Sequence, residues 1–227
     1  SPPDPPQLYG KIRRDRYYCR RGNPREVTAD DLRAVADFIE GHYSRDPFKS
    51  FLTSIFPNSG YVNPTMGTDK RQEFINTYVR AFSREASSEK GRCAFCGRAA
   101  AADAFRQHIP LVAGEGIINY GPGGRPGLKV CGVCLLCIQA LPIGCDRCEG
   151  RLLLAHSDDN DLTFALTREC VQANLRALSL SSSGSGGTSG LERKYPRTLL
   201  LQRLLMVAQR QQMQRTTGVM SHLPRIT

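Results

Sequence analysis

The sequence lacks an apolar run of 18 residues and the pattern of a signal peptide. A membrane-spanning helix needs about 20 mainly apolar residues, so we expect no membrane partner. Also missing are a Ser/His/Asp set, a paired-carboxylate set and a Gly-Lys-Ser/Thr phosphate-binding ending. These absences leave the common hydrolytic and nucleotide-binding classes without support. Because the first residue is Ser1, one interpretation is a trimmed or tagged piece of a longer polypeptide.

Cysteine is abundant, and much of it occurs in pairs. Nine cysteines are present, and Cys93-Ala-Phe-Cys96 and Cys131-Gly-Val-Cys134 are separated by 34 residues. Two such pairs are typical of a structural zinc site. Closing the loop costs about 3 kcal/mol of chain entropy, whereas structural zinc binds with about 10–16 kcal/mol. We therefore predict one structural Zn²⁺ held by Cys93, Cys96, Cys131 and Cys134, in a reducing, cytoplasmic compartment.

The remaining cysteines leave alternatives open. Cys145 and Cys148 form a further pair, which Cys137 and His156 could complete as a second metal site or which could exchange ligands with the first. Cys19 and Cys170 have no paired neighbour. We interpret both as ordinary thiols, with Cys170 in the core.

The net charge of +10 is concentrated at the ends of the chain. Residues 1–26 hold seven Lys/Arg and three Asp/Glu, residues 191–227 hold seven and one, and residues 27–190 balance. Basic ends favour contact with a polyanion, although a solvated tail is an alternative. Candidate nucleic-acid contacts are Lys11, Arg13, Arg14 and Arg16, which precede two tyrosines, and Arg125 and Lys129 in and beside a glycine-rich loop.

Neither of these two basic segments has a single interpretation. The first could instead be a solvated edge strand. The glycine-rich loop, residues 121–127, could be a flexible connector, or it could lie in a DNA groove because glycine permits close backbone approach.

Apolar periodicity predicts an α+β protein that is mostly helical. Helices are expected over residues 28–43, 46–56, 68–86, 131–141 and 161–178 and from Pro196 onward, with a strand over 151–156. A four-cysteine zinc-finger module is thus inserted between helical segments, with a few short strands. We divide the chain into a basic segment (1–27), a helical region (28–90), the zinc module with its Gly-rich loop (91–150), a strand and helix on the body (151–180), a linker (181–190) and a basic helix and tail (191–227).

One enzyme hypothesis is an HNH nuclease. The two cysteine pairs with His108 and Asn119 between them imitate the order of its zinc frame, general base and asparagine. However, Gln107 stands where an acidic metal ligand is expected, and the residues after Cys134 supply no ligands for a divalent catalytic ion. We therefore expect no enzyme activity, with a zinc-bearing protein–protein scaffold as a further alternative.

Several stretches in a fixed order resemble one family. They are Cys93-Ala-Phe-Cys96-Gly97, His108-Ile-Pro-Leu111, Cys131-Gly-Val-Cys134-Leu-Leu136, Gln139-Ala-Leu-Pro142-Ile-Gly144 and Leu154-Ala-His156-Ser-Asp158-Asp159. Together they resemble the CXXC–CXXC family of large subunits of type I CRISPR Cascade complexes, the type I-B and I-A branch. Gly22-Asn-Pro24, Ile55-Phe-Pro-Asn-Ser-Gly60 and Tyr195-Pro-Arg-Thr198 are further landmarks.

The resemblance implies a non-catalytic subunit in the cytoplasm of a prokaryote. Its partners would be guide RNA, target double-stranded DNA, other Cascade subunits, and a nuclease-helicase or transposition effector. It would recognise the protospacer-adjacent motif in duplex DNA and help to part the strands. In such systems base pairing reads the target while protein reads a short flanking duplex.

Overall fold

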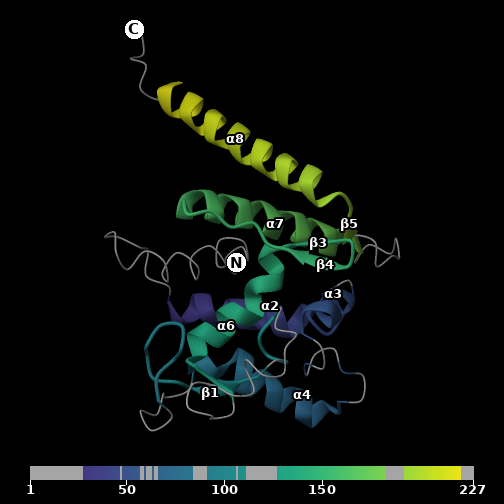
Figure 1. Ribbon diagram of the computed structural model, residues 1–227, viewed down its shortest axis with the longest axis vertical. Helices are drawn as coiled ribbons and strands as arrows, with labels where there is room; N and C mark the ends of the chain where they lie inside the picture. The colour runs from purple at the N-terminus through teal and green to yellow at the C-terminus, as the bar shows by residue number, and fades with distance from the viewer. Residues whose placement is uncertain are drawn as a thin grey trace.

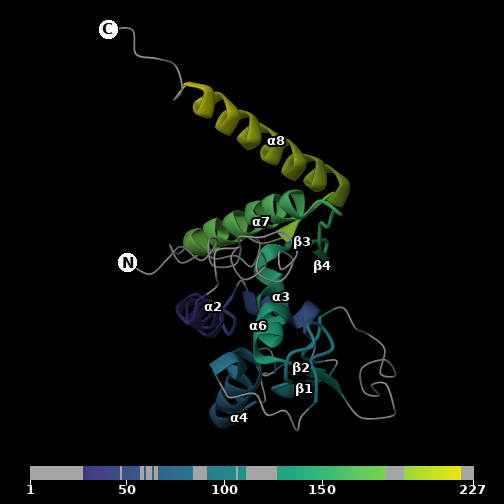
Figure 2. The same ribbon diagram turned by 90° about the vertical axis from the view of Figure 1, so that its left-hand side faces the viewer.

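The computed structural model describes residues 28–46, 48–56, 59, 63, 66–83, 91–105, 107–110, 127–181 and 192–220. Figures 1 and 2 show three levels: a lower level with α4, β1 and β2, a middle level with α2 and α3, and an upper level with α7 and α8. Lys11, Arg13, Arg14, Arg16, Arg125 and most of the predicted linker lie outside the described residues.

The first two helices form as their sequences predict. Helix α2 (Ala29–His42) begins after Thr28, whose hydroxyl accepts a hydrogen bond from the Asp31 amide, and Asp31 in turn accepts one from the Thr28 amide. This reciprocal capping box satisfies two amides that have no partner inside the helix. Helix α3 (Phe48–Ile55) follows. The apolar residues that recur at helical spacing along α3 are all buried: Phe48, Phe51, Leu52 and Ile55.

The helix predicted over 68–86 is not continuous. It consists of α4 (Thr68–Phe74), a π-helical segment η1 (Ile75–Val79) and a 3₁₀ turn η2 (Ala81–Ser83). The Arg80 amide donates to the Ile75 carbonyl, five residues back, at 2.9 Å. At the same place the Arg80 side chain binds Asp37 and Glu40 of α2. Apolar spacing cannot report this change of helix type, because it coincides with contacts between segments distant in sequence.

The zinc module predicted from the cysteines contains a small sheet and a central helix. Strand β1 (Ala102–Ala104) pairs antiparallel with β2 (Leu128–Val130), and helix α6 (Gly132–Ala140) follows, ending in the 3₁₀ turn η4 (Leu141–Gly144). The helix predicted over 131–141 ends close to this boundary, where Pro142 lies in the 3₁₀ turn. Helix α6 is apolar almost all round and contacts α2, η1 and η2, so it joins the metal module to the main core.

The last part of the chain adds a second sheet and two long helices. The sheet has the order β4-β3-β5, from β3 (Asp146–Cys148), β4 (Arg151–Leu153) and β5 (Glu192–Arg193), with β3/β4 antiparallel and β3/β5 parallel. Strand β4 is shorter than the strand predicted over 151–156. Helices α7 (Asn160–Ser181) and α8 (Pro196–Met220) pack on each other.

Helix α8 is the outermost element in Figures 1 and 2. It buries Leu199, Arg203 and Val207, while Leu201 and Leu205 stay about 60% exposed. The sequence leaves open whether the leucines of this helix pack on the body or on a partner. In the structure Leu199 is buried, whereas Leu201 and Leu205 remain at the surface.

The predicted fold class is confirmed: the chain is mostly helical, with short strands and a four-cysteine cluster between helical segments. The domain boundaries stay predictions. No helix within the described ranges combines the length and the apolar character needed to cross a membrane.

Candidate metal centre

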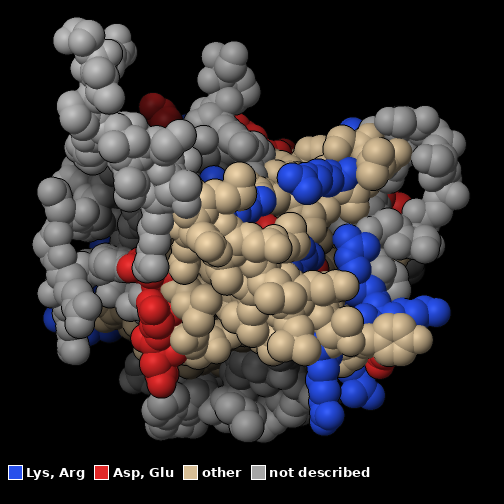
Figure 3. Space-filling model, turned by 90° about the horizontal axis from the view of Figure 1, so that it is seen from above, with Lys and Arg blue, Asp and Glu red and all other residues tan. Residues whose placement is uncertain are grey.

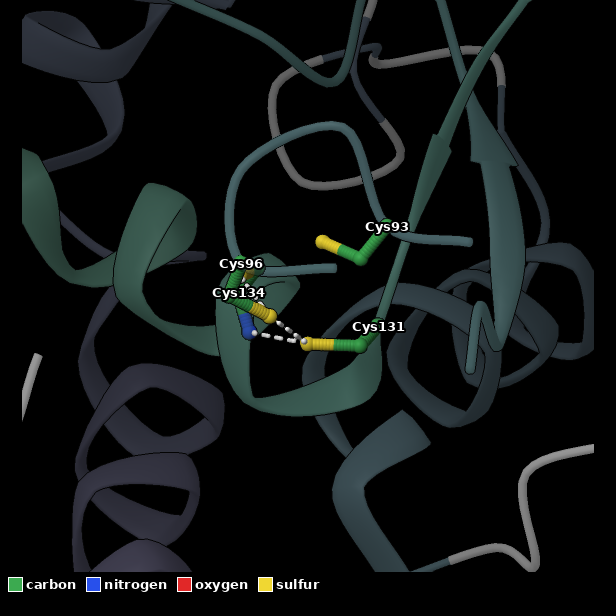
Figure 4. Close-up of side chains that lie close together, drawn as sticks. All are labelled: Cys93, Cys96, Cys131 and Cys134. Carbon is green, nitrogen blue, oxygen red and sulfur yellow. Dashed lines mark hydrogen bonds between the residues drawn. The ribbon is translucent and has the colours of Figure 1, made fainter. Parts of the chain in front are cut away.

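The four predicted ligands come together in space. The sulfurs of Cys93, Cys96, Cys131 and Cys134 all lie within 4.8 Å of one another. The Cys96 sulfur is 3.4 Å from that of Cys131 and 3.5 Å from that of Cys134, and Cys93 points toward the same centre (Figure 4). A tetrahedral Zn²⁺ with bonds of about 2.3 Å places its sulfurs about 3.8 Å apart. The donor set and its spacing therefore fit one zinc ion.

The first cysteine pair lies on a tight turn. Arg92 and Ala99 form an isolated antiparallel bridge, the Cys93 amide donates to the Arg98 carbonyl at 2.7 Å, and the Gly97 amide donates to the Cys93 carbonyl at 2.9 Å. Gly97 has φ of 74°, a conformation that glycine adopts without steric cost. The turn brings both sulfurs to one side, with Cys93 buried and Cys96 at the surface.

The second pair lies at the start of a helix. Cys131 is the N-cap residue of α6, and its sulfur accepts a hydrogen bond from the Cys134 amide at 3.4 Å. The positive end of the helix dipole favours thiolates there. Hydrogen bonds to its sulfur, first from the Cys134 thiol and then from the Cys134 amide, lower the pKa of Cys131 to about 4 against the opposing effect of burial. The N-terminus of α6 therefore stabilises Cys131 as a thiolate, the form that binds a metal cation.

Strand contacts connect the two pairs. The Ala94 amide donates to the Lys129 carbonyl, and the Ala101 amide donates to the Val130 carbonyl, both at 2.9 Å. In the sheet Asp103 lies opposite Lys129, and the Lys129 ammonium is 3.0 Å from the Asp103 carboxylate. Lys129, predicted as a DNA contact, therefore has an intramolecular counter-ion. The structure does not describe Arg125, the other predicted contact of this loop.

Gly132 fixes how the module docks. A Cβ at this position would lie 2.3 Å from the Phe82 amide nitrogen and 2.4 Å from the Ala81 carbonyl. Only glycine lets the first turn of α6 approach η2 so closely. Gly132 had no predicted role, and the local signal for one is its position between the ligands Cys131 and Cys134.

His108, the residue that imitates the HNH general base, is buried and packed against aromatic side chains. It is 4% exposed, and its ring lies on that of Tyr78 with centroids 3.6 Å apart. Its Nδ1 accepts a hydrogen bond from the Phe105 amide, and its carbonyl accepts one from Gln139 of α6. Burial lowers the pKa of His108 to about 4. These contacts tie the segment after β1 to α6, and Asn119, the other HNH candidate, lies outside the described residues.

Across the described part of the chain, the four-sulfur group is the one set of His, Cys, Asp and Glu side chains close enough to hold a metal. The alternative second site is not gathered there: Cys145 and Cys148 are buried, whereas His156 is exposed. Cys170 is buried, as predicted, and its thiol donates to Asp146 at 3.3 Å.

The fold and site define a protein with a structural, zinc-finger-type metal centre. Residues 86–146, about a quarter of the chain, match the family model described as CRISPR-associated protein (Cas_CXXC_CXXC). The matched segment contains both cysteine pairs, β1, β2 and α6. The predicted similarity to the CXXC–CXXC CRISPR-associated family is thereby confirmed over this segment. Searches of curated proteins and of solved structures found no match.

Proposed function

We propose that this chain is a non-catalytic, nucleic-acid-binding subunit of an RNA-guided CRISPR interference complex of the Cascade kind. One observation carries the proposal: the four-cysteine cluster lies inside the segment that matches a CRISPR-associated family. In this role the chain contacts guide RNA and neighbouring subunits and recognises the protospacer-adjacent motif in target duplex DNA. It also helps to recruit a nuclease-helicase or transposition effector. The resemblance of the sequence to type I-B and I-A large subunits supports these finer assignments.

The metal contributes rigidity in this proposal. When bound, zinc is a structural cross-link between the turn that carries Cys93 and the helix that begins after Cys131. The ladder from Ala102–Val130 to Ala104–Leu128 then places residue 105 and residue 127 side by side. Gly127 has φ of 79°, and a Cβ there would lie 3.0 Å from Asp103 and from Phe105. The segment that contains Arg125 therefore begins and ends at fixed neighbouring points, a suitable base for a DNA-contacting loop.

A protein–protein scaffold is the second candidate, and helix α8 favours it. Leu201, Leu205 and Met213 are exposed along this helix. Two of the basic residues that suggested polyanion binding are neutralised within the chain, because Arg203 pairs with Asp146 and Arg210 with Glu169. The C-terminal segment is thus less cationic at its surface than its composition indicates.

The deciding experiment measures binding of the purified chain to labelled duplex DNA and to guide-like RNA across a salt series, with and without Mg²⁺ or Mn²⁺. We expect binding that weakens linearly in log–log form with salt, without cleavage, and co-purification with a guide RNA and other subunits from the native host. If the chain shows no salt-dependent binding to either nucleic acid, the protein–protein scaffold becomes the favoured function. Metal-dependent cleavage by the parent, lost in His108→Ala, would show a nuclease.

A further inference from the structure

Tyr195 is an exposed aromatic residue in an unusual backbone conformation. Its φ is 58°, which is uncommon for any residue except glycine, and its side chain is 70% exposed. The Tyr195 amide donates to the Glu149 carboxylate at 3.4 Å, and its carbonyl accepts from the Leu199 amide at 3.0 Å. These two contacts hold the backbone in this conformation, and the large ring lies in solvent. Such strain persists where surrounding structure imposes it and is concentrated at binding sites.

The residues beside Tyr195 are cationic. Lys194 and Arg197 flank it in sequence and are exposed. Arg151 of β4 and Arg193 of β5 both pair with Cys148 of β3, so they lie about 10 Å apart on either side of one strand. Arg151 is also exposed. Figure 3 shows Lys and Arg side chains gathered at the end of the upper face where α8 begins.

These cations differ from those further along α8. Arg203 and Arg210 are held by buried carboxylates. For Arg151, Lys194 and Arg197, by contrast, the described residues provide no acidic side chain within ion-pair distance. The Glu149 carboxylate lies beside the Tyr195 backbone and accepts a hydrogen bond from the Tyr195 amide. The surface is therefore net positive around one exposed ring.

From this arrangement we infer that Arg151, Lys194, Tyr195 and Arg197, here called the Tyr195 patch, bind single-stranded nucleic acid. The cations would contact successive phosphates while the Tyr195 ring stacks on an unpaired base, the combination by which proteins hold single strands. A duplex hides its base faces and would use only the cations. The inference rests on the proposed function, because it names the surface and the strand form that such a subunit would hold.

The test is fluorescence anisotropy with a labelled 15-nucleotide oligo-dT and the corresponding duplex, using the full chain loaded with zinc. Tyr195→Asn removes the ring, and asparagine tolerates the left-handed conformation. We expect it to weaken oligo-dT binding by roughly 5- to 150-fold, with little effect on duplex, whereas Tyr195→Phe keeps the ring and the affinity. An unchanged melting temperature shows that each variant is folded.

The electrostatic part has its own variant. Lys194→Ala/Arg197→Ala should lower the slope of log affinity against log salt for oligo-dT by about 1.4, or about 0.7 for each cation. Arg45→Ala/Lys70→Ala removes the same charge from two exposed positions outside the patch, and it should leave the slope unchanged.

The outcomes separate the two proposals. If the parent binds oligo-dT but neither the Tyr195 nor the Lys194/Arg197 variants weaken it, the patch is wrong and the proposed function stands. Binding to duplex alone, or to anionic phospholipid vesicles in place of oligonucleotides, also overturns the patch. If the parent binds no nucleic acid, the proposed function fails and the patch fails with it.

Discussion

Replacing Arg203 by alanine removes the cation that neutralises Asp146 between α8 and the sheet. The Arg203 guanidinium donates two hydrogen bonds to this carboxylate, at 3.0 and 2.6 Å, and the Cys170 thiol donates a third at 3.3 Å. Asp146 is 2% exposed and Arg203 is 8% exposed. In Arg203→Ala the Asp146 carboxylate therefore stays buried with only the weak thiol donor.

The expected cost follows from this burial. Removing one partner of a buried ion pair costs about 3–5 kcal/mol, because the other charge is left uncompensated. For a protein of this size each kcal/mol shifts the melting temperature by about 2–4 °C, so Arg203→Ala should melt roughly 6–20 °C lower. The double variant Asp146→Leu/Arg203→Met replaces the pair by apolar side chains of similar size. It should lie close to the parent in stability, since neither charge is then buried.

Urea and thermal unfolding followed by circular dichroism measure these changes. Arg168→Ala is the matched control, because Arg168 is an exposed arginine on α7, and its effect should stay within about 0.5 kcal/mol. If Arg203→Ala were no less stable than Arg168→Ala, the ion pair would not hold α8 in place. If the double variant were as unstable as the single one, the loss would come from packing and the electrostatic reasoning would be wrong.

Three further predictions concern the metal module. Cys96→Ser should abolish binding of the one zinc per chain, measured by elemental analysis, and make residues 93–134 sensitive to protease. The control Cys137→Ser should keep the metal. Zinc retained in Cys96→Ser would contradict the proposed ligand set. Gly132→Ala should destabilise the chain by about 1–3 kcal/mol, because the added Cβ clashes with η2. The control Gly41→Ala should be neutral or stabilising, since a Cβ there has nothing within 4 Å. Equal changes in stability would exclude the close approach of α6 to η2. Because burial lowers the pKa of His108 from 6.5 to about 4, the unfolded chain binds a proton more readily, so stability should fall by about 3 kcal/mol as pH decreases from about 6.5 to about 4. His108→Phe should lose this part of the pH dependence, measured by urea unfolding, and identical slopes in the two proteins would show that His108 does not titrate in this window.

Much of the local structure could be predicted from the sequence. Thr28 and Asp31 form a capping box with contacts three residues apart, and α3 buries the residues that its spacing indicated. The ligand set was readable for a similar reason, since each Cys-x-x-Cys pair is a local unit with known metal chemistry. Loop closure then costs little compared with zinc binding.

Other features depend on partners that the sequence does not pair. From the sequence Arg203 and Arg210 are expected to be surface cations, but each forms an ion pair with a buried carboxylate on another element. His108 resembled a general base between cysteine pairs, yet it is buried against Tyr78. Gly132 is meaningful only because η2 approaches it.

By itself the sequence determined the helices that begin with their own caps and the four sulfurs of the metal site, because those features arise from contacts within a few residues or from ligand chemistry. The tertiary structure alone decided which charged side chains form ion pairs, where the α-helix α4 continues as a π-helix, and that the Tyr195 ring stays in solvent. Those outcomes depend on contacts between side chains from distant parts of the chain, and residue spacing along the sequence does not predict such contacts.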